Sequence, residues 1–177
     1  MKLYIARHGQ TDWNLKGLAQ GQVDIPLNET GIHQAEALRE KLRSYDFDIC
    51  YCSPLKRAAK TAEIAVDGRT KIIFDDNLKE RSFGTLEGTD PKTWGVDDFD
   101  LKLNTNKGGI EPIRELLARS KKVLERIKSE NSPDAKILVV GHGTFFKTLN
   151  FNIAGYNDTT DFRSFHLENG ALAEYDI

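Results

Sequence analysis

Two histidines of this chain each follow a short apolar run and each precede a glycine. His8 comes after the run 3–6 and Arg7, and His142 comes after the run 137–140 and a glycine. A guanidinium beside an imidazole can bind an anion that the ring nitrogen attacks. Two imidazoles can instead ligate a metal ion, but such a site also needs a carboxylate or a third histidine. An arginine–histidine pair is also common on solvated surfaces, so these residues alone leave three interpretations open.

Both apolar runs are typical of buried strands, because they are too short for helices and rich in β-forming side chains. The run 137–140 is apolar at every position, which is typical of a central strand covered on both faces. Ligands of open α/β sheets bind in the crevice at the carboxyl ends of the strands. His8 and His142 can therefore meet there, and Gly9 is expected to let the backbone turn closely around the occupant.

The composition is that of an ordinary globular protein, with 39% hydrophobic and 29% charged residues among 177. This length fits one domain, residues 1–177, with a substantial core. The net charge of −2 provides no field that would collect nucleic acid or an anionic membrane, so neither is an expected partner. The first apolar run is too short for a signal peptide, and no later run reaches membrane-spanning length. A cytoplasmic location is the resulting expectation.

The other metal-ligating residue types lack a suitable setting. Cys50 and Cys52 lie two residues apart in a predicted strand, where they share one face but are poorly placed for a disulfide. We expect reduced core thiols, because a metal pair would need a second pair of soft ligands. His33 and His166 are interpreted as surface or packing residues. No metal and no cofactor are expected.

The predicted elements alternate as in an α/β domain. Asn28 is placed to cap one helix, and Pro54 to begin another. Asn169-Gly170 is a strong hairpin signal. Strands are predicted at residues 3–6, 47–52, 71–74, 136–141, 162–167 and 171–175, and helices at 28–43, 54–66, 112–130 and 144–154. Residues 12–27 and 75–109 are expected to be loops, with one short helix near 92–99.

Four motifs occur along the chain in a specific order. They are RHGQT at residues 7–11, SPLKRAAKTA at 53–62, LKERSFGTLEG at 78–88 and GHG at 141–143. Together they resemble the histidine phosphatase superfamily, also called the phosphoglycerate-mutase-like family. The resemblance implies a three-layer α/β/α domain with a mostly parallel central sheet, to which this chain is expected to add a C-terminal hairpin.

The resemblance also implies a phosphohistidine mechanism. His8 corresponds to the nucleophile that attacks phosphorus and carries the phosphoryl group, and Glu80 to the acid that protonates the leaving oxygen and later activates water. Arg7, Arg57 and His142 correspond to the groups around the phosphate, where two guanidiniums and an imidazolium would supply charge without a metal. The further substrate-binding candidates are Asn14, Gln10, Thr11 and Gly143.

The chain also departs from the family pattern. Many members read Gly-Gly-Glu-Ser before the long helix, where this chain has GGIE at residues 108–111 followed by Pro112, so a serine cap is lost. Residues 89–110 contain no arginine pair like the one that mutases use on their substrate's carboxylate. The segment at about 86–110 is expected to be a lid or substrate loop, and Glu87 within it a structural carboxylate.

Three functions from different classes remain. The first is a metal-independent phosphomonoesterase that hydrolyses a small phosphorylated metabolite through a phosphohistidine. The second is a phosphoglycerate mutase, an isomerase that returns the phosphoryl group to substrate. The third is a non-catalytic module that binds a phospho-ligand or a protein, for which Glu80 would be unnecessary. The missing arginine pair favours the phosphatase. No pattern in the sequence specifies the natural substrate or the oligomeric state.

Overall fold

The computed structural model describes residues 1–177 and contains a five-stranded sheet in the order β3-β2-β4-β1-β5. The first four strands are parallel, and β5 is antiparallel to β1 at one edge. The strands are β1 (Lys2–Arg7), β2 (Ile49–Cys52), β3 (Ile72–Phe74), β4 (Lys136–Gly141) and β5 (Leu172–Asp176). The sheet is thus mostly parallel, as predicted.

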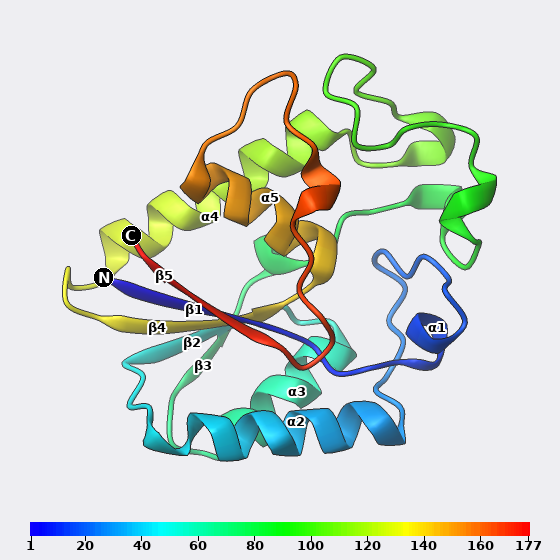
Figure 1. The fold of residues 1–177 in the computed structure, drawn as a ribbon. Coiled ribbons are helices and arrows are strands. Elements are labelled where there is room, and N and C mark those ends of the chain that lie inside the picture. Colours follow the sequence, from blue (N-terminus) through cyan, green and yellow to red (C-terminus); the bar gives the residue numbers. More distant parts are fainter.

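Four long helices cover the two faces of this sheet. Helices α2 and α3 lie together on one face, and α4 and α5 lie together on the other (Figure 1). The helices are α1 (Asp12–Leu15), α2 (Glu29–Lys41), α3 (Lys56–Val66), α4 (Ile113–Glu130) and α5 (Gly143–Ala154). This arrangement confirms the predicted α/β/α fold. None of the helices has both the length and the apolar composition needed to cross a membrane.

The central strands alternate between two hydrophobic cores. Leu3 and Ile5 of β1 pack with α4 and α5, whereas Tyr4 and Ala6 pack with α2 and α3. Strand β4 lies between β1 and β2 and is buried from its second residue onward. This confirms its prediction as a central strand. Cys50 and Cys52 are buried free thiols that point to the α2–α3 side, also as predicted.

The N-termini of two helices show how the surrounding loops are held. Asn28 caps α2 as predicted, with its side chain accepting a hydrogen bond from the backbone N–H of Gly31 at 2.9 Å. Helix α3 begins at Lys56 and not at Pro54, because Leu55 is still extended. The N–H of Lys56 donates to the Asp24 carboxylate at 2.7 Å. A loop residue far away in sequence therefore supplies the cap that α3 lacks.

The predicted C-terminal hairpin is wrong in its first arm. Residues 162–164 form a 3₁₀ turn, and β5 pairs with β1. Phe162 is buried against Phe151 of α5, with ring centroids 4.8 Å apart, so this segment packs on a helix. The Asn169-Gly170 turn does form, with Gly170 at a φ of 73°.

The two long loops also differ in detail from the prediction. Helix α1 lies within the expected loop 12–27, where Thr11 and Asn14 form a capping box. The short helix expected at 92–99 is reduced to a 3₁₀ turn at Pro91–Thr93. Trp94 still has helical backbone angles, but Gly95 has a φ of 62°. A helix therefore cannot continue past Trp94.

Gly9 is required for a different reason from the one expected. A Cβ atom on Gly9 would lie 2.3 Å from the carbonyl oxygen of Gly31, and a Cβ on Gly31 would lie 2.1 Å from the carbonyl oxygen of Gln10. The loop after β1 thus packs backbone against backbone on the first turn of α2. This contact fixes the loop that follows His8.

The contact predicts an unusual response to an alanine in a helix. Gly→Ala inside a helix normally stabilises by up to about 1 kcal/mol. Gly31→Ala should instead lower the free energy of unfolding by about 1–3 kcal/mol, the usual cost of overpacking. Urea unfolding measures this change. Glu36→Ala, at an exposed position of the same helix, is the control and should stay within about 0.5 kcal/mol. A stabilised Gly31→Ala protein would contradict the close packing.

Candidate active site

The pairing of β1 with β4 brings the two predicted histidines together. Arg7 is opposite Gly141 in this parallel pair, and the N–H of His8 donates to the Gly141 carbonyl at 3.0 Å. The rings of His8 and His142 then lie with centroids 5.2 Å apart. The crevice expected from the sequence is therefore present at the carboxyl ends of these strands.

His8 is held in one tautomer by its own backbone. Its Nδ1 lies 2.6 Å from the Gly9 carbonyl oxygen, and a carbonyl can only accept, so Nδ1 carries the proton. The lone pair is consequently on Nε2. Burial lowers the pKa of His8 well below its ordinary value of 6.5, and the charges of Arg57 and Arg7 lower it further. The imidazole is therefore neutral and able to act as a nucleophile at neutral pH.

Two guanidiniums, of the buried Arg57 and the half-buried Arg7, flank this ring and are anchored by main-chain carbonyls. Arg7 donates to the Leu167 carbonyl at 2.8 Å. Arg57 donates to the carbonyls of Val23 and Gly21 at 2.9 and 2.7 Å. Burial lowers the pKa of Arg57 to about 10, so it is still charged at neutral pH. Each guanidinium keeps its Nε–H free of any hydrogen bond.

His142 is held in the opposite tautomer. Its Nε2 lies 2.7 Å from the Ser53 hydroxyl, and that hydroxyl accepts from the N–H of Leu55 at 3.4 Å. Nε2 is the one hydrogen-bond acceptor that this hydroxyl contacts for its own proton, so the hydroxyl donates to Nε2 and the proton of His142 is on Nδ1. Burial lowers the pKa of His142 well below 6.5, and the positive charge of Arg57 lowers it further. His142 is therefore neutral in the free protein, and the imidazolium expected around a bound phosphate stays a prediction.

Three nitrogen atoms of the site have no hydrogen-bond partner. They are Nε of Arg7, Nε of Arg57 and Nδ1 of His142, and no other buried side-chain nitrogen or oxygen in the protein lacks one. Unpaired buried donors are costly, so their presence indicates a ligand that accepts hydrogen bonds. Three donors around one neutral imidazole suit a tetrahedral oxyanion such as a phosphoryl group.

Glu80 lies at the N-terminus of α5. Its Oε1 accepts the N–H groups of Arg81 and Phe145 at 2.8 and 2.9 Å, and its Oε2 accepts the N–H of Thr144 at 3.0 Å. Oε2 thus has one partner fewer than Oε1, which leaves it free to exchange a proton with a ligand. Three main-chain bonds hold the carboxyl group in a fixed orientation beside the cavity.

A salt bridge between Arg119 and Glu111, which the sequence did not predict, holds the segment before Glu80. Arg119 binds both oxygens of Glu111, at 2.9 and 2.7 Å. The same guanidinium donates to the carbonyls of Asn77 and Lys79 at 2.8 Å. The loop that carries Glu80 is thereby fixed to α4. Glu111 is the last residue of the sequence GGIE at 108–111, where the chain departs from the family pattern.

A cavity of about 180 Å³ opens in front of these groups. Five predicted site residues form part of its wall: Arg7, His8, Asn14, Arg57 and Glu80. His142 is fully buried and is not among the lining residues, but its ring lies next to that of His8. Sequence reasoning missed the other lining residues, which are Leu18, Ala19, Gln20, Gly21, Phe83, Pro91 and Thr144. Thr144 is in the first turn of α5, and the others come from loops whose course no local sequence pattern specifies.

Three of the predicted substrate-binding residues do not line the cavity. Gln10 accepts a hydrogen bond from Asn28 at 3.1 Å, and the Thr11 hydroxyl donates to Gln20 at 2.8 Å. Both therefore stabilise the loop. Gly143 lies behind Arg7, because a Cβ there would be 3.2 Å from the Arg7 Nε. These residues support the site without facing a ligand.

Glu87 has the structural role predicted for it. Its Oε1 accepts the N–H of Phe83 at 3.1 Å and the N–H of Gln22 at 2.9 Å. The carboxylate thus joins its own loop to the loop that supplies carbonyls to Arg57. No group of three or more histidine, cysteine, aspartate or glutamate side chains in the protein is arranged to hold a metal ion.

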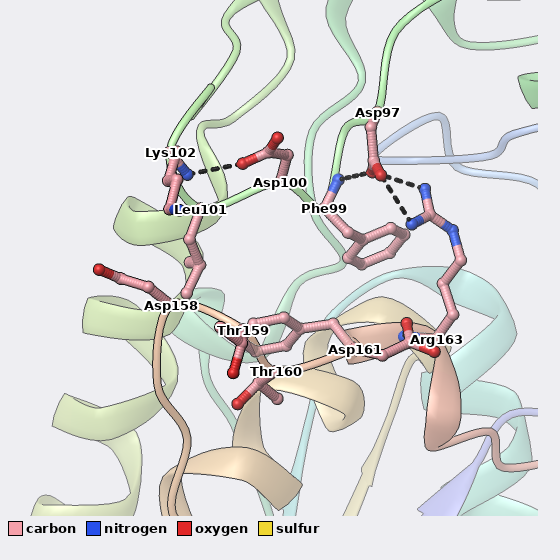
Figure 2. A pocket seen from close by; sticks show the side chains of 11 residues that line it. Asp97, Phe99, Asp100, Leu101, Lys102, Asp158, Thr159, Thr160, Asp161 and Arg163 are labelled. Atoms are coloured by element: carbon pink, nitrogen blue, oxygen red, sulfur yellow. Dashed lines mark hydrogen bonds and ion pairs between the residues drawn. The ribbon is translucent and has the colours of Figure 1, made fainter.

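A separate, acidic hollow of about 330 Å³ lies between residues 97–102 and 158–163 (Figure 2). Its carboxylates are occupied by the main chain. Asp97 accepts from the N–H of Phe99 at 3.0 Å, and Asp100 from the N–H of Lys102 at 2.7 Å. Asp97 also forms an ion pair with Arg163 at 2.7 Å. These aspartates therefore stabilise turns of the loop.

Comparison with known proteins supports the interpretation of this geometry. The family model described as the histidine phosphatase superfamily (branch 1) matches residues 3–177. The chain is 35% identical over 174 residues to the Bacillus subtilis protein named uncharacterized phosphatase PhoE, covering 98% of this chain and 86% of that protein. It is also 35% identical to a 2,3-bisphosphoglycerate-dependent phosphoglycerate mutase of Cytophaga hutchinsonii, over 83% of this chain and 74% of the mutase.

Solved structures show the same architecture. A phosphoserine phosphatase from Entamoeba histolytica, crystallised with 3-phosphoglyceric acid, superposes with a TM-score of 0.83 at 30% identity, over 98% of this chain and 89% of that one. The alpha-ribazole phosphatase from Shigella flexneri gives a TM-score of 0.85 at 26% identity, over 100% and 91% of the two chains. The similarity extends over nearly the whole chain in both.

The two buried histidines predict a loss of stability in mild acid. The unfolded chain takes up protons near the ordinary histidine pKa of 6.5, whereas the folded protein keeps His8 and His142 neutral to a much lower pH. The unfolded state therefore binds more protons in this window, so the free energy of unfolding falls as the pH decreases below 6.5. We expect a loss of about 1 kcal/mol per histidine between about pH 7 and about pH 5.5, measured by urea unfolding.

The control for this experiment is a double variant, His8→Asn with His142→Asn, which removes both titrating rings. Its free energy of unfolding should fall by about 2 kcal/mol less over the same interval, because neither side chain takes up a proton in either state. If both proteins lose the same stability, the histidines are not held neutral by the fold.

Proposed function

The chain belongs to branch 1 of the histidine phosphatase superfamily, and from this premise we propose that it hydrolyses small phosphomonoesters through a phosphohistidine on Nε2 of His8. The observation that carries the proposal is the set of three unpaired donors around a neutral imidazole whose lone pair is free. Nε of Arg7, Nε of Arg57 and Nδ1 of His142 would each donate to a phosphoryl oxygen and balance the charge that develops there.

The reaction has two steps. In the first, the Nε2 lone pair attacks phosphorus, the bond from phosphorus to the ester oxygen breaks, and Glu80 gives a proton to the departing alcohol. In the second, the Glu80 carboxylate takes a proton from water, the water oxygen attacks phosphorus, and the phosphorus–nitrogen bond breaks. Inorganic phosphate leaves and His8 is regenerated. No step requires a charge beyond those of the chain's own side chains.

A covalent intermediate on His8 is the first expectation. Wild-type protein quenched with phosphorus-labelled p-nitrophenyl phosphate should carry label that is lost in acid and retained in base, as a phosphohistidine is. His8→Ala should carry none and should lose turnover by several orders of magnitude, since no other buried imidazole presents a free Nε2. His166→Ala is the matched control, because His166 is exposed and outside the site. Labelling of the His8→Ala protein would refute the assignment.

The mutase alternative is supported by relatives that carry that name, and it makes a different product. A mutase must bind its substrate's carboxylate, yet residues 89–110 contain no arginine. Of their lysines, Lys107 donates to the Trp94 carbonyl at 2.7 Å. With 3-phosphoglycerate and 2,3-bisphosphoglycerate present, we therefore expect inorganic phosphate as the main product. A phosphate assay and phosphorus NMR measure the products. Rapid formation of 2-phosphoglycerate with little phosphate would favour the mutase.

A further inference from the structure

A second cavity, of about 370 Å³, adjoins the one that contains His8. The two cavities share Phe83, Pro91 and Thr144 as lining residues. Glu80 lies at their junction, because it lines the first cavity and its Oε2 accepts the N–H of Thr144. The bond that breaks in the proposed reaction would have its phosphorus in the first cavity, so its alcohol would extend past Glu80 into the second.

Apolar side chains form much of this second cavity. Phe83 and Trp94 pack with ring centroids 5.2 Å apart and belong to a small buried cluster of their own, against which Val96 packs. The only polar atom of the Trp94 side chain, its Nε1, donates to the Thr89 hydroxyl at 2.8 Å. Phe99 completes the apolar surface. This surface is held in place by its own packing.

Two ionic groups of the lining, Asp98 and Arg163, are already ion-paired. Asp98 accepts from the buried Arg81 guanidinium at 2.9 Å, and Arg163 binds Asp97 at 2.7 Å. Both guanidiniums lie near the Phe99 ring, 5.5 and 5.0 Å from its centroid. Phe99 and Arg163 line both this cavity and the acidic hollow in which Figure 2 shows them. Lys92, at an exposed position, is the one ionic side chain of the lining without an ion-pair partner.

We propose that this cavity binds the alcohol part of the substrate and selects phosphomonoesters with a hydrocarbon leaving group. A polyol leaving group would find few free partners there, because Asp98 and Arg163 are engaged in ion pairs. A hydrocarbon chain would instead bury its surface against Phe83, Trp94, Val96 and Phe99. The inference rests on the proposed function, and it assigns the expected substrate loop, about 86–110, to this recognition.

A series of primary alkyl phosphates tests the proposal. Ethyl, butyl and hexyl phosphate have leaving groups of similar basicity, so differences in kcat/KM report binding of the chain and not the ease of its departure. We expect kcat/KM to rise by about two- to fourfold per methylene, the value for burial of a CH₂ group. Glycerol 3-phosphate, also a primary ester, should resemble ethyl phosphate or fall below it.

Two substitutions in the loop localise the effect. Val96→Asp places a charge in the cavity wall and should remove most of the dependence on chain length; Val96→Ser, which introduces no charge, should reduce it. Leu103→Asp is the matched control, because Leu103 is 53% exposed and lines neither cavity. It should retain the wild-type dependence. A circular dichroism spectrum and an unfolding curve establish that each variant is folded.

Binding of methyl-, butyl- and hexylphosphonate, measured by calorimetry, separates this inference from the proposed function. If longer phosphonates bind more tightly and this gain is lost in Val96→Asp, the apolar subsite is supported. If no ester is hydrolysed in that case, only the phosphatase proposal fails. Hydrolysis of all three alkyl phosphates at equal kcat/KM, with equal phosphonate affinities, overturns the apolar subsite and leaves the phosphatase intact. A dependence on chain length that survives in Val96→Asp also overturns it.

Discussion

The anchoring of two guanidiniums at the carboxyl ends of the strands is the constraint on which the rest of the site depends. Arg7 and Arg57 are each tied down by main-chain carbonyls: that of Leu167 for Arg7, those of Gly21 and Val23 for Arg57. All three carbonyls belong to segments that are neither helix nor strand. The course of these irregular segments therefore decides where the two guanidiniums are held. Burial without direct salt bridges also explains why the pKa of Arg57 is lowered.

The parts of this arrangement that depend on local pattern could be predicted from the sequence. Apolar runs specified β1 and β4, Asn28 specified the start of α2, and the two histidine–glycine motifs indicated a shared crevice. The parts that failed depend on partners distant in the chain. Whether residues 162–167 pair with β5 or pack on α5 depends on Phe151. The true start of α3 depends on Asp24.

The carboxylates show the same limit of local reasoning. Glu80, Glu87 and Glu111 are all glutamates of irregular segments, yet each has a different set of donors. Glu80 accepts the N–H groups at the start of α5 and faces the cavity, and Glu87 joins two loops. Glu111 receives both arms of Arg119. Composition and spacing do not distinguish them, because the distinction lies in which donors the fold brings to each. Only the motif order singled out Glu80 before its surroundings were known.

Two separate physical effects set the state of each histidine. Burial and the nearby guanidiniums keep a second proton off both rings, so His8 and His142 are equally neutral. The hydrogen bond that each ring makes then decides which nitrogen holds the single proton. A carbonyl acceptor at Nδ1 of His8 frees a lone pair on Nε2, whereas a hydroxyl donor at Nε2 of His142 leaves an N–H on Nδ1. Two identical side chains in the same charge state are thereby given opposite roles, one as an electron-pair donor and the other as a hydrogen-bond donor. Exchanging the partners of the rings would exchange these roles without changing the charge of the site.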